Sequence, residues 1–213
     1  MTAATWRLLG FDAREREEDC DKTPIPEAVR EEFLLRPELK CPFSVDRHIW
    51  PTHFLYHPEI RHLIGQHQPA LLEVSARCEG GLWLNLERMR QRLNENNRAA
   101  ILISVELLTP ESTSLAEFPS SLIYTDTEPG SLPSGSTFLG YDVADVGFWS
   151  GLSNCAYTKQ ELAELRPNWS KRINDFGLLQ LESDAIAFKE ISDMRVPDHA
   201  PFWVYRLHRL PTT

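Results

Sequence analysis

The most constraining feature of the sequence is the segment 101–107, whose side chains alternate as they do in a β-strand. On one side of an extended chain every residue is apolar: Ile101, Ile103, Val105 and Leu107. The other side is mixed and includes Ser104 and Glu106. Because successive strand residues point to opposite faces of a sheet, this pattern predicts a β-strand with one buried face, and we place it at the centre of the sheet.

Shorter patterns predict the remaining elements. Further strands are expected at about 5–11, 72–76, 138–143 and 202–210. Apolar residues at helical spacing predict helices at about 27–36, 58–64, 82–93, 158–176 and 183–196. This order differs from the regular alternation of a doubly wound nucleotide-binding sheet. We therefore predict an α+β fold in a single domain, residues 1–213, with a mixed, mostly antiparallel sheet of about four to six strands and about five to six helices.

Two of the predicted helices carry local signals. Thr158 and Glu161 have the spacing of a capping box, which marks the first turn of a helix. Pro167 interrupts that helix and predicts either a kink or the start of a second helix. Ser183 is expected to cap the last helix, and four apolar residues are expected to face the core: Ala187, Phe188, Ile191 and Met194.

One long segment, residues 109–136, is rich in turn-forming residues. Ser, Thr, Pro and Gly make up 17 of its 28 residues. Loops of this length inside a compact domain usually serve a function. We predict a long loop here, with a lid over a ligand pocket as one interpretation.

Charge and apolar patterning restrict the class of partner. The chain has 22 basic and 31 acidic residues, a net charge of −9, and phosphate-tracking proteins need a basic surface, so no nucleic-acid partner is expected. No apolar run approaches the roughly 18 residues of a membrane span. The first ten residues lack the basic start and the apolar stretch of a secretory signal, so a cytoplasmic location is expected.

The histidines and cysteines are the residues most able to hold a metal ion. Five histidines fall between His48 and His67, and His53 and His57 have helical ligand spacing. Pro58 directly follows His57 and disfavours helical geometry there, so we predict no metal site. The four cysteines form no CxxC pair, and the sequence lacks the common phosphate- and nucleotide-binding motifs. No cofactor is therefore expected.

The segment 140–155 holds the candidate functional residues, which follow a predicted strand in a turn-rich region. We interpret five of them as a partner-binding surface: Tyr141, Asp142, Asp145, Phe148 and Trp149. On the alternative interpretation, Asp142 and Asp145, or Cys155 with His199, carry out catalysis. A structural role, in which the aspartates cap a helix, also remains open.

Two acidic stretches favour the binding interpretation. Residues 12–32 contain nine acidic and four basic residues, and residues 182–193 contain four acidic residues and one lysine. Such surfaces attract basic partners, although they also keep a protein soluble. We therefore predict a non-enzymatic, acidic, bacterial immunity-type inhibitor that covers a basic toxin or enzyme. On that prediction the aspartates lie on the surface beside Tyr141 and Trp149; the alternative is a small hydrolase or transferase.

Overall fold

The computed structural model describes residues 4–15, 27–39, 82–83, 85–95, 100–110, 131–153 and 156–211. Its strands are β1 (Ala4–Glu15), β2 (Ala100–Pro110), β3 (Thr137–Ala144) and β4 (Trp203–Arg209). Its helices are α2 (Glu27–Phe33), α6 (Leu86–Glu95), α7 (Lys159–Trp169) and α8 (Glu182–Arg195), with a short 3-10 helix, η2 (Ser170–Arg172), after α7. A mixed α+β fold is confirmed, and the described residues contain slightly fewer elements than the sequence predicts.

The four strands form one antiparallel sheet in the order β1-β2-β4-β3. β2 therefore has a strand on each side, as its alternating pattern predicts. Ile103, Val105 and Leu107 are buried on one face of the sheet. β1 is longer than predicted, because it pairs with β2 along its whole length. Asp12, the first residue of the acidic stretch 12–32, accordingly lies buried in a strand and not on the acidic surface that the sequence predicts.

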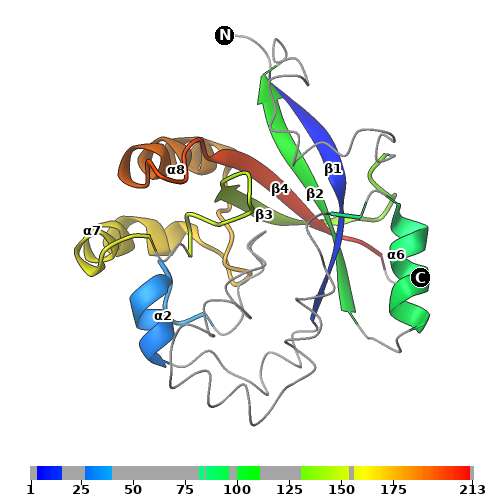
Figure 1. Ribbon diagram of the computed structural model, residues 1–213, viewed down its shortest axis with the longest axis horizontal. Helices are drawn as coiled ribbons and strands as arrows, with labels where there is room; N and C mark the ends of the chain where they lie inside the picture. Colours follow the sequence, from blue (N-terminus) through cyan, green and yellow to red (C-terminus); the bar gives the residue numbers. More distant parts are fainter. Residues whose placement is uncertain are drawn as a thin grey trace.

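Two apolar clusters cover opposite ends of one face of the sheet, as Figure 1 shows for the helices that carry them. At one end α7 and α8 pack on Val143 and Val204. At the other end α6 packs on Leu8 and Leu102 through Met89. The opposite face of the sheet forms a third cluster around Tyr205. The middle of the first face, between the two clusters, is thus free for polar side chains.

The two signalled helices differ in how well the sequence predicted them. Thr158 is the N-cap of α7, and both hydrogen bonds of the capping box are formed. Pro167 lies inside α7, which continues to Trp169 before η2 begins. α8 begins one residue before Ser183, and Leu181 occupies the N-cap without a side-chain hydrogen bond.

The inward face of α8 is rotated from the predicted one. Ala185, Phe188 and Ser192 are buried, whereas Met194 is 72% exposed. The buried hydroxyl of Ser192 has a hydrogen-bond partner in the Tyr157 hydroxyl, at 3.1 Å. Its small side chain also leaves room for the backbone of Gly151, where an added Cβ would lie 2.6 Å from the Ser192 oxygen. The expectation that Ala187 and Met194 face the core is wrong, whereas Phe188 is buried as predicted.

Several predictions fall outside the described residues. These are the helix at 58–64, the strand at 72–76 and most of the loop at 109–136. The single-domain organisation stays a prediction. Among the helices of the described ranges, none is both long and apolar enough to cross a membrane.

Candidate functional site

The turn that follows β3 is built around the carboxylate of Asp145. Its Oδ1 accepts hydrogen bonds from the backbone N–H groups of Gly147, at 2.8 Å, and Trp149, at 2.9 Å. A short acidic side chain can satisfy backbone donors in this way where no strand partner is available. Phe148, between the two donors, has a φ of 63°, a conformation that non-glycine residues rarely adopt. Asp145 therefore holds an unusual turn in place.

The other oxygen of the same carboxylate pairs with His199. Oδ2 lies 2.7 Å from Nδ1 of the imidazole, and the Trp149 ring lies 5.1 Å from the imidazole ring, centroid to centroid. The His199 side chain is 26% exposed, and its Nε2 has no hydrogen-bond partner among the described residues. A carboxylate at Nδ1 favours the tautomer with a lone pair at Nε2. Such a pair can orient an imidazole for proton transfer.

The carboxylate of Asp142 is enclosed and cannot contact a partner. The residue is fully buried, and its Oδ1 accepts from the Val143 backbone at 2.8 Å and from the Ser150 hydroxyl at 2.5 Å. Asp145 is also buried. The expectation that these aspartates lie on the surface is wrong, because buried backbone and hydroxyl donors of the turn need acceptors. Burial, together with the Asp145 and Asp142 carboxylates, raises the pKa of Tyr205 well above its usual value.

The five residues predicted to bind a partner do not form one surface. Tyr141 and Asp142 are successive residues of β3, so their side chains point to opposite faces of the sheet. Phe148 and Trp149 are half-buried in the turn, and the Phe148 ring packs 5.5 Å from Tyr205. Of the five, only Tyr141 belongs to the face on which α7 and α8 pack.

The remaining sequence candidates are not placed by the structure. Cys155 and the histidines from His48 to His67 lie outside the described residues. Within the described ranges, no three His, Cys, Asp or Glu side chains are grouped so as to hold a metal ion.

The face that carries Tyr141 presents a cluster that the sequence did not suggest. Its centre is Arg206, whose guanidinium carbon lies 4.4 Å from the centroid of the Trp6 ring. The rings form a connected series with centroid distances of 5.7 Å for Trp6 to Tyr141 and 5.0 Å for Tyr141 to Phe138. Phe138 is 43% exposed, and Trp6 and Tyr141 are half-buried. We call these four residues the Arg206 cluster.

Glu106 holds the guanidinium of Arg206 in a fixed orientation. Nε of Arg206 donates to Oε2 at 2.7 Å and Nη2 donates to Oε1 at 2.9 Å. Nδ1 of His208 lies 3.2 Å from Oε2 of Glu106. Burial acts to raise the pKa of Glu106, but His208 and Arg206 together outweigh it and lower the pKa to about 2. Glu106 therefore stays ionised and keeps the centre of the Arg206 cluster rigid.

A carboxylate and a guanidinium both act on the hydroxyl of Tyr141. The pKa of its hydroxyl is raised by burial and by the charge of Glu182, against a smaller opposing effect of Arg206. Glu182 begins α8, so the Arg206 cluster has a carboxylate beside its aromatic surface.

Comparisons with protein-family models, with curated proteins and with solved structures give no match for this chain.

Proposed function

We propose that this chain is a non-enzymatic protein-binding protein of the acidic immunity type, which covers a basic toxin or effector enzyme. The observation that carries the proposal is the Arg206 cluster, a partly exposed group of Trp, Tyr, Phe and Arg on one face of the sheet. Trp, Tyr and Arg are the residues that most often dominate the binding energy of interfaces.

Rigidity supports this assignment. Arg206 is fixed by two hydrogen bonds to Glu106, and the rings of the cluster contact one another. Binding through side chains that are already ordered avoids much of the entropy cost of immobilising them. The cluster thus has both the composition and the order of an interface centre.

Charge supports a basic partner. The charge of Arg206 is balanced by Glu106, so the cluster adds little positive charge to a chain whose net charge is −9. Glu182 lies close enough to Tyr141 to affect its pKa, and the described residues show no ion pair for this carboxylate. An aromatic centre with a carboxylate at its rim matches a partner surface that carries apolar groups flanked by Lys or Arg.

Loss of the exposed rings is expected to abolish partner capture. The variant Phe138→Ala/Tyr141→Ala removes two rings of the cluster, and each hot-spot truncation typically costs about 2 kcal/mol or more of binding free energy. We expect the tagged wild-type chain to retain one basic protein from a lysate of its own host at moderate salt, and the variant to lose it. Affinities of the purified pair would then be compared by calorimetry.

The matched control is Met194→Ala, which removes an exposed apolar side chain from α8, outside the cluster. This variant should bind like wild type, and melting curves should show that all three proteins are folded at the temperature of the binding assay. Equal binding by the ring variant would contradict an interface at the Arg206 cluster. Absence of any stoichiometric protein on the wild-type chain would contradict the binding function itself.

A hydrolase or transferase is the second candidate function, and the pairing of Asp145 with His199 favours it. The imidazole is partly exposed and its Nε2 is available, so His199 has the arrangement of a general base. Asp142 is enclosed and drops out of this mechanism, while Cys155 lies outside the described residues. Without a nucleophile beside the imidazole, the described geometry supports activation of water at most.

His199→Ala separates the two functions. On the binding proposal, wild type and variant should show the same background rate with chromogenic ester and phosphate substrates, because no step depends on the imidazole. A general base contributes about 10²- to 10⁴-fold to a rate. A wild-type rate above background that falls by that factor in His199→Ala, with the melting temperature unchanged, would establish the enzyme and reject the binding-only proposal.

A further inference from the structure

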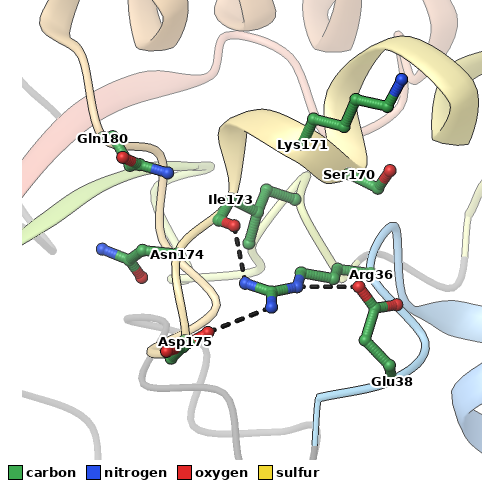
Figure 2. A pocket seen from close by; sticks show the side chains of 8 residues that line it. All are labelled: Arg36, Glu38, Ser170, Lys171, Ile173, Asn174, Asp175 and Gln180. Carbon is green, nitrogen blue, oxygen red and sulfur yellow. Dashed lines mark hydrogen bonds and ion pairs between the residues drawn. The ribbon is translucent and has the colours of Figure 1, made fainter.

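A polar cavity of about 550 Å³ lies between the segment that follows α2 and the loop that follows η2. Figure 2 shows the side chains around it: Arg36, Glu38, Ser170, Lys171, Ile173, Asn174, Asp175 and Gln180. Seven of these eight are polar or charged. The cavity is therefore unsuited to an apolar ligand and suited to a small, charged one.

Hydrogen bonds fix both walls of this cavity. Arg166 of α7 donates from Nε to the Leu34 carbonyl at 3.1 Å, which holds the α2 side. On the other side, Nδ2 of Asn174 donates to the Leu139 carbonyl at 2.7 Å, and its Oδ1 accepts from the Phe176 and Leu178 backbones. The cavity is thus formed before any ligand binds.

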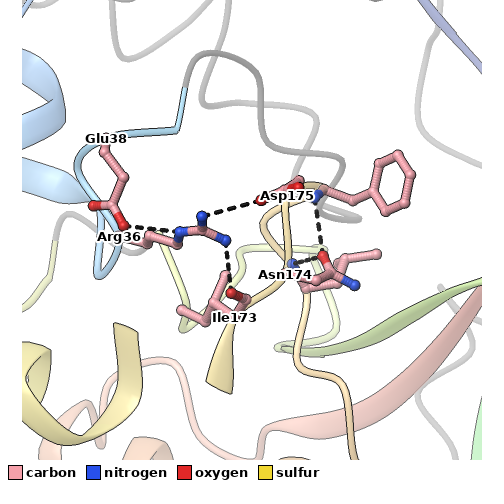
Figure 3. A network of polar contacts seen from close by, with 7 residues as sticks. Arg36, Glu38, Ile173, Asn174 and Asp175 are labelled. Atoms are coloured by element: carbon pink, nitrogen blue, oxygen red, sulfur yellow. Dashed lines mark hydrogen bonds and ion pairs between the residues drawn. The ribbon is translucent and has the colours of Figure 1, made fainter. Parts of the chain in front are cut away.

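The guanidinium of Arg36 lies in the centre of the network in Figure 3 and keeps unused donors. Nη1 donates to the Ile173 carbonyl at 2.8 Å, Nε donates to Glu38 at 2.8 Å, and Nη2 donates to Asp175 at 3.0 Å. A guanidinium has five N–H groups, so two have no partner among the described residues. These two N–H groups of Arg36 can therefore donate hydrogen bonds to acceptor oxygens of a ligand.

The remaining lining adds donors and only weak competitors. Lys171 lies at the rim, is exposed and makes no ion pair or hydrogen bond with any residue described, and its ammonium points away from Arg36 in Figure 2. The carboxylates on Arg36 are themselves exposed, 62% for Glu38 and 93% for Asp175. Such exposed pairs contribute little free energy, so an incoming anion can replace one of them.

We propose that this cavity binds a small oxyanion, a phosphate or carboxylate group of a soluble molecule, at the guanidinium of Arg36, with Lys171 at the rim of the cavity. The oxygens of the anion accept hydrogen bonds from the two free N–H groups of the Arg36 guanidinium. They also take the place of the Asp175 carboxylate at Nη2. Planar guanidinium donors suit both phosphate and carboxylate oxygens, so the two sources share this chemistry.

The test is titration of the full chain with inorganic phosphate and, separately, with citrate, followed by amide NMR. We expect saturable shifts confined to the cavity, and the probe that binds more tightly identifies the source. Asp175→Asn should tighten binding about two- to fivefold by removing a competing carboxylate, and Lys171→Met should weaken binding by a similar factor. Arg36→Met should abolish it, with a melting curve to confirm that this variant folds.

Charge-matched controls lie outside the cavity. Asp198→Asn and Lys159→Met change the same charges at exposed positions, and each should alter binding less than its cavity counterpart. The site would be supported if Asp175→Asn tightens and Lys171→Met weakens the binding of the anion, each by more than its control does. Absence of saturable shifts with both probes would overturn it. So would weaker or unchanged binding in Asp175→Asn, because the carboxylate of Asp175 then does not compete with the anion for Arg36.

Discussion

Glu106→Gln is expected to lower the free energy of unfolding by about 3 kcal/mol. The substitution keeps the shape of the side chain but removes the charge that faces Arg206 across the strand pair. Arg206 then remains partly buried with a neutral partner, and the loss of one member of such a pair is costly. Urea denaturation at neutral pH measures the difference directly.

Two further variants show that the effect belongs to the buried pair. Glu87→Gln removes a carboxylate from an exposed pair with Arg90 on α6, and should cost less than about 0.5 kcal/mol. Glu106→Gln/Arg206→Met leaves no uncompensated charge and should recover much of the lost stability. Arg206→Met alone completes the comparison. If the double variant lost as much free energy of unfolding as Glu106→Gln and Arg206→Met lose together, the buried pair would not be the cause of the destabilisation.

The same carboxylate predicts a dependence of stability on acid. The pKa of Glu106 is lowered from 4.5 to about 2 in the folded chain, so the folded state favours the ionised form. The resulting stabilisation is complete above pH 4.5 and is lost as the pH falls toward 2. The difference between wild type and Glu106→Gln should therefore shrink across this interval. A constant difference would contradict the role given to the ionised carboxylate.

Elements with local signals were predictable from the sequence. The alternation at 101–107 predicted β2 and its central place, because a strand with a strict apolar face must be covered. Thr158 and Glu161 predicted the start of α7, because a capping box involves only residues of one turn. Both signals depend on neighbours in the chain and not on the tertiary structure.

Interactions across strands could not be predicted in the same way. Glu106 and Arg206 are 100 residues apart and meet only because β2 pairs with β4 in one register. A shift by one residue would place either side chain on the opposite face. The Arg206 cluster depends on three strand pairings, β1 with β2, β2 with β4 and β3 with β4. The sequence pattern therefore indicated Tyr141 but not Trp6, Phe138 or Arg206.

The burial of the two aspartates was hidden for a related reason. A sequence shows the charge of Asp142 and Asp145 but not the backbone donors that a turn leaves without partners. Once the turn forms, a carboxylate that accepts two or more hydrogen bonds is more stable inside it than an exposed one. Acidic residues in a turn-rich segment therefore indicate a structural acceptor as readily as a binding surface.

Asp145→Ala is expected to cost about 2–3 kcal/mol, because it leaves the N–H groups of Gly147 and Trp149 without their acceptor. Asp145→Asn keeps an oxygen at the position of Oδ1 and should cost about 1 kcal/mol. His199→Ala removes only a partly exposed partner and should also cost less than about 1 kcal/mol. Thermal and urea unfolding of the three variants provide the comparison.

These three variants show whether the Asp145 carboxylate mainly stabilises the turn or mainly orients the imidazole of His199. If it mainly holds the turn, stability follows the order His199→Ala, Asp145→Asn, Asp145→Ala, from least to most destabilised, and Phe148 keeps its positive φ only while an acceptor is present. If it mainly orients the imidazole, Asp145→Asn and Asp145→Ala should be equally mild, and both should change the tautomer of His199 seen by NMR. The second pattern would shift the assignment from a binding protein toward a general base at His199, since a carboxylate that the fold does not need is then held there for the imidazole.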